Sequence, residues 1–516
     1  MNLPIRRHRD CRAVARRPLI CLLGSLALLA PSACTTAPGP TVAEAVPELA
    51  ERVGAPLADH LPWDQPSAAW DGASPLSLDA ALATALQNNR GLRRVLLEVE
   101  QRRARYQDSQ LAPNPMVDIG GGIPLDMGTA PILAMIGTQV DWLWKREAMV
   151  GETDAALRAS LFEAAAITVS TAVEVRAAYV GAAAAQELLA LAQLDERTAA
   201  RVMNALVLSF EQGEANAMLS NDARMAWSDA LVRAMDAQQA LLVAKARLLQ
   251  AIGRGDVDME WHTVATTTKA AIDECDLPVP PNPQDQAELT TLVRERRLDL
   301  RAAQARVDGA TQRIALAKAG QWPSVNLGGG YDRGMEGGEA VMFVGQFSLP
   351  IFNQGQFRVA AAQVELEIAR IDADALWQQA LLDVWRARGA LATQEHHAVQ
   401  IRDVTLGALA ANLRLLADGV EAGETAPVRL WQSERQETRV RAQLATARRD
   451  SMFAALAFEQ ALAGARLPAG AGMGGGAGAG AMGATGAGSA GSGGGMGGGS
   501  SGSGTTLELT AEEGMQ

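Results

Sequence analysis

This chain of 516 residues is poor in aromatic side chains, histidine and cysteine. Aromatic residues make up only 4% of it, and it has five histidines and four cysteines. Ala and Leu instead dominate long stretches, a composition typical of extended helices and not of one large globular core. The formal net charge is −12, and an acidic chain is a poor candidate for binding nucleic acid.

The N-terminal residues have the pattern of an export signal. Six Arg between positions 6 and 17 precede an apolar run from Leu19 to Ala30, which is too short to span a bilayer permanently. The following Pro31-Ser32-Ala33-Cys34 resembles the lipobox of bacterial lipoproteins. We therefore expect residues 1–33 to be removed and Cys34 to carry lipid, including palmitate, at the outer membrane. Ordinary cleavage near Ala33 is the alternative.

The scarcity of cysteine excludes a disulfide framework. Cys11 and Cys21 would leave with the signal and Cys34 would carry lipid, so Cys275 would stand alone. No structural disulfide is then possible within one chain. We interpret Cys275 as a small buried hydrophobe.

Composition divides the rest of the chain into five segments. The C-terminal segment is rich in Gly, Ala and Ser and cannot bury enough apolar surface to order itself. Its scattered Met residues fit neutral filler better than a Cu(I) site. The predicted segments are an N-terminal linker (34–75), a first repeat (76–254), a Pro-containing linker (255–285), a second repeat (286–463) and a disordered tail (464–516).

The two repeats share one numerical offset over a long distance. Residues 115–122 recur as 323–330, an offset of 208, and Gln186-Glu187 recurs as Gln394-Glu395 at the same offset. A period of this size is too long for a solenoid unit. The sequence therefore predicts a duplicated half-protein whose halves pack as pseudo-symmetric neighbours.

Each repeat contains a long stretch without proline and with apolar residues at helical spacing. The stretches run from Glu147 to Glu211 and from Gln354 to Ala417, and they predict long helices in coiled-coil packing. A continuous helix of this length would measure on the order of 100 Å. No globular core needs such a length.

Related turns follow the two long helices, at an offset of 210. Gly213 and Gly423 can adopt the left-handed conformation that ends a helix, so a second helix can return and form a hairpin. The hairpin tips carry carboxylates that are either simply solvated or form an acidic rim for gating. These are Glu211, Glu214, Asp222, Asp418, Glu421 and Glu424.

Short segments bounded by Pro and Gly lie between the helices of each repeat. We predict strands at residues 116–123, 132–144, 324–331 and 340–352. The second segment alternates like a membrane strand, whereas the fourth has its apolar residues on the opposite parity, which indicates a bulge or a slip in the alignment. Aromatic residues gather here, and we expect a membrane-interface girdle that includes Trp142, Trp144, Trp322 and Phe352. A soluble sheet with an aromatic core is the alternative.

Four motifs in this frame resemble the TolC-type outer-membrane efflux proteins. Leu76–Asn89 is similar to the family's opening helix, Ala112–Pro115 and Gln321–Pro323 to its approach to the strands, and Ser348–Gly355 to its re-entry into the long helix. The resemblance covers about Leu76 to Ala463. It implies a mainly helical fold with a membrane sheet, in which three chains form a twelve-stranded barrel continuous with a periplasmic α-helical barrel.

The resemblance also implies partners and a function. Members of the family meet a periplasmic adaptor and an inner-membrane pump, often of the resistance-nodulation-division type, and the linker 255–285 would contribute to the equatorial region. The expected function is a passive exit duct for small solutes, either drugs or heavy-metal ions. Lys145-Arg146 is the retained part of a sequence common in the heavy-metal branch. The alternatives are an exit channel for protein secretion and a lipid-anchored coiled-coil spacer without a pore.

Neither an enzyme site nor a cofactor site is predicted. His396 and His397 are adjacent, so on a helix they point about 100° apart and do not form the i, i+4 pair of a zinc site. Gly120-Gly121-Gly122 lacks the Gly-Lys-Ser/Thr sequence that binds phosphate. The abundant carboxylates are those expected on wet helix faces.

Overall fold

The structure is a computed structural model that describes residues 36–54, 70–123, 130–264, 285–334 and 338–464. The expected signal peptide, Cys34, Cys275 and the Gly-rich tail lie outside the described residues. The predicted boundaries at 33, at 285 and at 463 therefore remain predictions.

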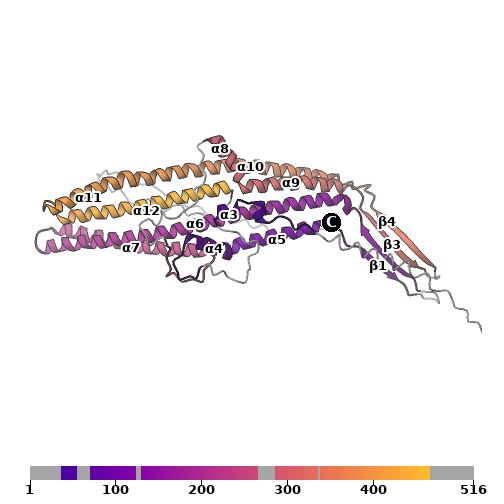
Figure 1. Cartoon of the computed structure of the whole chain (residues 1–516), viewed down its shortest axis with the longest axis horizontal. Helices are drawn as coiled ribbons and strands as arrows, with labels where there is room; N and C mark the ends of the chain where they lie inside the picture. Colours follow the sequence, from indigo (N-terminus) through magenta and orange to yellow (C-terminus); the bar gives the residue numbers. More distant parts are fainter. Residues whose placement is uncertain (1–35, 55–69, 124–129, 265–284, 335–337, 465–516) are drawn as a thin grey trace, which may run out of the picture. The chain divides into compact units, whose positions relative to one another are not determined.

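The described part is mainly helical, with four strands, and one order of elements occurs twice (Figure 1). Two short helices come first, α2 (Val42–Ala45) and α3 (Leu49–Val53). The first series is α4 (Leu78–Asn88), α5 (Arg90–Gln110), β1 (Met116–Gly121), β2 (Ile132–Gln139), α6 (Trp142–Glu211) and α7 (Ala217–Ile252). The second is α8 (Gln286–Arg296), α9 (Leu298–Ala319), β3 (Val325–Arg333), β4 (Glu339–Phe347), α10 (Gln356–Gln400), a π-helical segment (Ile401–Thr405), α11 (Leu406–Glu421) and α12 (Pro427–Ala463).

The helix breaks occur at equivalent positions of the two series. Asn89 caps α5 by accepting hydrogen bonds from the backbone N–H groups of Gly91 and Leu92. Arg297, 208 residues later, has the same extended backbone between α8 and α9. A residue outside the helical region ends one helix and starts the next. This agreement is what a duplicated half-protein predicts.

Alanine explains why α6 can pack on several helices at once. It packs against α5, α7, α9 and α12, and Ala164, Ala182 and Ala184 are fully buried at these seams. Small side chains allow close approach of neighbouring helices and cost little side-chain entropy. The most apolar window of α6 is long enough to cross a membrane, but 67% of it is buried inside the protein. Its hydrophobicity therefore belongs to the helix core.

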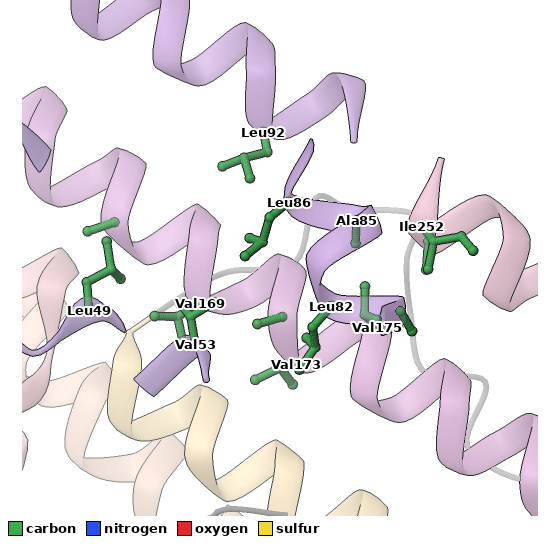
Figure 2. Close-up of a cluster of buried hydrophobic side chains, with 14 of the residues drawn as sticks. Leu49, Val53, Leu82, Ala85, Leu86, Leu92, Val169, Val173, Val175 and Ile252 are labelled. Atoms are coloured by element: carbon green, nitrogen blue, oxygen red, sulfur yellow. The ribbon is translucent and has the colours of Figure 1, made fainter. Parts of the chain in front are cut away.

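The largest hydrophobic cluster joins the first series of helices to the N-terminal segment (Figure 2). Leu49 and Val53 of α3 meet Leu82 and Leu86 of α4 and Val173 of α6 in this cluster. Trp261, from the start of the predicted linker 255–285, is also buried there, edge-on to Trp70. A smaller cluster joins α8, α10 and α12 around Val293, Val384 and Phe458. The first cluster also includes Leu298 of α9 and Leu456 of α12, so the second series contributes to it.

The strands form one antiparallel sheet in the order β1-β2-β3-β4. Pairing is one-to-one along every described strand, and no bulge interrupts it within those strands. Val117 pairs with Ile136, and the equivalent Val325 pairs with Phe347. Ile136 therefore corresponds to Phe347, 211 residues later. The opposite parity seen in the sequence is a slip in the 208-residue alignment, because the second hairpin is longer by three residues.

Two predicted strands end earlier than expected. The prediction that Trp142 and Trp144 lie in a strand is wrong, because they occupy the first turn of α6. The backbone N–H of Val140 still bonds to Val325, but the N–H of Leu143 already bonds to Val140 in a turn. Lys145 then contacts Asp141 at 2.5 Å, an i, i+4 pair that favours the helix. In the second hairpin β4 ends at Phe347, so Phe352 lies in the irregular segment before α10.

The long helices begin and end close to the predicted positions. The first starts at Trp142 instead of Glu147 and ends at Glu211 as predicted. The second runs from Gln356 to Glu421 and contains the π-helical segment 401–405. This segment lies between Gln394, where the offset between the two repeats is still 208 residues, and Gly423, where the offset is 210 residues. A π-helical turn accommodates additional residues within a helix.

Candidate functional site

The sheet has one apolar face that is exposed to solvent in the isolated chain. Residues paired across strands share a face, so the register places Val117, Ile119, Ile136, Leu327, Val341, Phe343 and Phe347 together. Ile119 is 79% exposed and Phe343 is 89% exposed. Clustered large apolar side chains in contact with water indicate a surface that is covered in the working protein.

The opposite face of the sheet is more polar and contains many glycines. It carries Asp118, Gln139, Asn326, Asp332 and Gln346, together with Gly137, Gly328 and Gly330. Alternation of an apolar and a polar face along each strand is the pattern of membrane β-strands. The nine residues of β3 and of β4 also match the roughly 9–11 residues of a strand that spans a bilayer.

The four predicted interface aromatics lie beyond the same end of the sheet. This end is defined by Gln139, Val325 and Phe347, where β2 and β4 end and β3 begins. Trp322 is 70% exposed and Phe352 is 95% exposed. Trp144 is also exposed, whereas Trp142 is partly buried, with the Arg146 guanidinium 5.3 Å from the centre of its ring. Their role at a membrane interface remains a prediction.

The two basic residues retained from the metal-branch sequence make local contacts at this junction. Lys145 pairs with the buried Asp141, and Arg146 lies over Trp142. Both contacts lie within the first turns of α6 and its N-cap. They account for the two residues structurally, without a metal ion.

The turns that follow α6 and α11 have one backbone conformation. Gly213 and Gly423 have φ of +79° and +76°. The N–H groups of Glu214 and Ala215 bond to the carbonyl of Ser209, and those of Glu424 and Thr425 bond to the carbonyl of Gly419. All equivalent pairs are 210 residues apart. The sequence prediction of matching turns closed by left-handed glycines is therefore confirmed.

The carboxylates predicted at the tips are all exposed. Glu211, Glu214, Glu421 and Glu424 lie in the turns or directly beside them, Asp418 lies in the last turn of α11, and Asp222 lies inside α7. Among the described residues, no ion pair joins any of these six to a basic side chain. Arg201, near the end of α6, contacts Glu434, near the start of α12, at 3.5 Å. Both tips therefore lie at the same end of the helix layer.

A charge cluster behind the tips was not predicted from the sequence. Asp195 of α6 is 6% exposed and accepts hydrogen bonds from Arg435 of α12 at 2.9 Å and from Arg233 of α7 at 3.1 Å. Arg439 lies 3.6 Å from it. Burial raises the pKa of Asp195, but the hydrogen bonds and charges of these arginines outweigh that effect and lower the pKa below its ordinary value. The cluster ties three helices together.

The same cluster borders a groove of about 700 Å³ between α6, α10 and α12. Its walls include Leu188 and Leu191 of α6, His397 of α10 and Ile401 of the π-helical segment. The π-helical segment therefore shapes this surface. Residues 195, 401 and 439 come together here from distant parts of the chain, which is why spacing in the sequence gave no sign of the groove.

The N-terminal segment lies along the helices. The backbone N–H of Ala37 bonds to Gln110 at 2.8 Å, and Arg103 donates to the carbonyl of Pro40 at 3.1 Å. Farther along, the buried Arg176 donates to the carbonyls of Arg52 and Val53 and to Glu459. Residues 37–54 therefore follow α5 from its sheet end toward the main core.

Comparison with known proteins shows what the chain is similar to. Residues 289–464 match the outer membrane efflux protein family. Two proteins of Pseudomonas putida strains, the toluene efflux pump outer membrane protein TtgF and the probable efflux pump outer membrane protein SepC, are each 29% identical over 305 residues. Each alignment covers 54% of this chain and 60% of the relative, so the chain spans about three fifths of their length.

Solved structures show the same fold. A crystal structure of CusC, described in terms of folding and transmembrane channel formation, superposes with a TM-score of 0.62 at 18% sequence identity, covering 75% of this chain and 92% of CusC. The mainly helical fold with few strands is thereby confirmed as that of outer-membrane channels. Residues 289–464 are thus similar in sequence to the outer membrane efflux proteins, and the described chain shares the fold of outer-membrane channels.

Proposed function

We propose that this protein is the outer-membrane channel of a tripartite efflux pump, a passive exit duct made of three copies of the chain. The observation that carries the proposal is the exposed apolar face of the sheet, which is opposite a more polar face with many glycines. Such a face is stable in lipid and unfavourable in water. A non-channel spacer would have no use for it.

The sheet cannot enter a membrane as a single copy. β1 and β4 are the two edges of the described sheet, and their outer backbone groups have no strand partner there. Unpaired N–H and C=O groups cost several kcal/mol each in hydrocarbon, so only closed barrels are tolerated. Four strands are too few to enclose a channel. Three chains, contributing twelve strands, satisfy both requirements.

The helices support the same association. α7 packs on α6 and α10 packs on α12, and both helices expose large apolar side chains. On α7 these are Met218, Met225, Val232 and Met235, and on α10 they are Val364, Ile368, Ile371 and Leu382. Neighbouring copies that cover both of these faces would bury them. The α6 helix of 70 residues would then extend the tube by about 100 Å into the periplasm.

The matching tips are the proposed contact with a periplasmic adaptor and, through it, with an inner-membrane pump. Gly213, Gly423 and the exposed carboxylates at positions 222, 418, 421 and 424 lie at the end of the helix layer that is distant from the sheet. The duct would need no energy source of its own. The proposed cargo consists of small solutes, since the relative TtgF is named for toluene efflux.

Purification and a bilayer recording test this function directly. After extraction in detergent, the protein should sediment as a particle with three times the mass of the 54.2 kDa chain, less the mass of any signal peptide removed. It should also give discrete conductance steps in a planar bilayer. In cells, a deletion strain and its complemented parent should differ in susceptibility to toluene, dyes, antibiotics or metals. A water-soluble monomer without conductance would contradict the duct and support the spacer. A conducting trimer whose deletion impairs only protein export would favour a secretion channel.

A further inference from the structure

The groove between α6, α10 and α12 has one end that carries charge and a wall that is mostly apolar. Asp195 of α6 and Arg439 of α12 lie at the end nearer the tips. From there the lining follows α6 back to Leu188 and α12 onward to Ala447. A molecule that fills the groove would therefore meet charged groups at one end and apolar side chains along its length.

The apolar wall comes from separate parts of the chain. Leu188 and Leu191 are half-buried and pack around the contact between Ala184 and Ala445, and Ile401 of the π-helical segment also lines the groove. The volume of about 700 Å³ falls within the range of small-molecule sites, which are mostly apolar with a few convergent polar groups. The groove therefore has the size and the wall of such a site.

The charged end of the groove carries an excess of positive charge. Arg233, Arg435 and Arg439 surround one carboxylate, that of Asp195. Nε of Arg439 lies 3.6 Å from this carboxylate, which is too far for a hydrogen bond, and no other described residue accepts one from the Arg439 guanidinium. The side chains of Arg439 and Arg233 are also 45% and 42% exposed. Both arginines can therefore still donate to a ligand.

The remaining charged and titratable groups of the groove do not cancel this excess. Asp450, at the opposite end, is paired with Arg449 of the same helix at 2.7 Å. His397 lines the groove as well, and an imidazole is either neutral or positive. The groove therefore attracts an anion and disfavours a cation.

We propose that this groove binds a small organic anion with an apolar body, such as an aryl sulfonate or an aryl carboxylate. The anionic group accepts hydrogen bonds from Arg439 and Arg233, whose planar guanidinium groups suit oxyanions. The apolar body lies along Leu188, Leu191 and Ile401. Such a ligand contacts α6, α12 and the π-helical segment at once. The inference goes beyond the proposed function and does not depend on it, because a single chain forms the whole groove.

Calorimetric titration of the purified full chain in a non-ionic detergent tests the proposal. The probe is naphthalenesulfonate, and neutral naphthalenemethanol and cationic naphthylmethylammonium are its counterparts with the same rings. Titration into detergent without protein is subtracted in each case. The sulfonate should bind saturably, with one molecule per chain, and at least about tenfold more tightly than the alcohol, because hydrogen bonds to charged groups are the stronger ones. Equal affinity for the three compounds, or no saturable binding of the sulfonate, would overturn the proposal.

A pair of variants on α12 locates the binding. Arg439→Gln removes the positive charge, and the variant should fold because Arg439 is exposed and holds no hydrogen bond to a described residue. The matched control is Arg441→Gln, since Arg441 pairs with Glu437 of the same helix at 2.7 Å and lies outside the groove lining. Arg439→Gln should weaken naphthalenesulfonate binding at least about tenfold, and Arg441→Gln should leave it unchanged. Equal affinity in the two variants, with normal helical circular dichroism in both, would reject the site.

Discussion

Gly423 ends α11 in the left-handed conformation, with φ of +76° and no atom within 4 Å of the position of a Cβ. The surrounding space is open, so backbone strain alone limits substitution there. A β-branched residue in this region costs about 1–3 kcal/mol, whereas asparagine tolerates it. Gly423→Val should therefore distort the tip and impair efflux, and Gly423→Asn should retain it.

Drug or solvent susceptibility of the complemented deletion strain measures this effect. Trimer formation on a native gel must be normal in both variants, because the turn lies far along the helices from the sheet. Full resistance with Gly423→Val would remove the tip from the gating and docking mechanism.

Asp195 is the only carboxylate that faces Arg233, Arg435 and Arg439 in the described ion pairs. Asp195→Ala would leave Arg435, which is mostly buried, without a counter-charge. Breaking a buried pair in this way costs about 3–5 kcal/mol. The thermal midpoint of the helical part, followed by circular dichroism in detergent, should fall clearly. Arg439→Ala removes an exposed partner, and its effect should be about 1 kcal/mol or less.

The acid dependence of this cluster has a defined direction. The pKa of Asp195 is lower in the folded protein than in the unfolded chain, so its contribution to stability is fully present above the unfolded value of about 3.9. It is lost as pH falls through the lowered folded pKa. The difference between the native chain and Asp195→Asn should therefore stay constant from neutral pH down to about pH 5. A difference that disappears near neutral pH would contradict this assignment.

At the scale of elements, the sheet offers a matched pair of neighbouring residues. Phe343 lies on the apolar face, and Val344 lies on the opposite face of the same strand. An arginine on the lipid face of a membrane strand costs about 2–4 kcal/mol at the bilayer midplane. Phe343→Arg should therefore reduce assembled trimer in the outer membrane, and Val344→Arg should assemble. Membrane fractionation and unheated gel electrophoresis separate the two outcomes. Equal assembly of both variants would mean that the apolar face does not meet lipid.

The sequence predicted the elements well where a periodic pattern spans many turns. Both long helices and both glycine turns were predicted, because helical spacing and a left-handed glycine are local properties. The end of β2 was misplaced, because apolar alternation continues through Trp142 and Trp144 after the strand has ended. The contact between Lys145 and Asp141 decides that boundary. The alternation of apolar residues in the sequence does not show where β2 ends and α6 begins.

The long-range features were not accessible from the sequence. Asp195 and Arg435 are 240 residues apart, and no spacing rule joins them. The apolar face that joins Ile136 to Phe343 across Gly329 depends on a register that the 208-residue alignment places incorrectly for β4. Register follows from the length of each hairpin and from pairing across the whole sheet. The structure supplies both.

At the scale of the whole molecule, the N-terminal segment connects the predicted lipid anchor to the membrane end of the chain. Ala37 bonds to Gln110 at the end of α5, the last helical residue before β1. Cys34 precedes Ala37 by three residues, a reach of at most about 11 Å for extended chain. Acyl chains on Cys34 would therefore enter the same bilayer that we propose the strands span. The hydrogen bonds that Arg103 and Arg176 donate to this segment would fix its position along the helices, and with it the position of the anchor.

Replacing the anchor distinguishes a channel from a tethered spacer. Cys34→Ser should abolish labelling with palmitate, because the thiol that carries lipid is missing. One acyl chain gives only marginal membrane binding, whereas a closed barrel is held by all its strands. The exported variant should therefore remain in the outer-membrane fraction after carbonate washing and still need detergent for extraction. If Cys34→Ser instead appears in the soluble periplasmic fraction, lipid alone holds the protein at the membrane. The apolar face of the sheet would then have to be covered by protein.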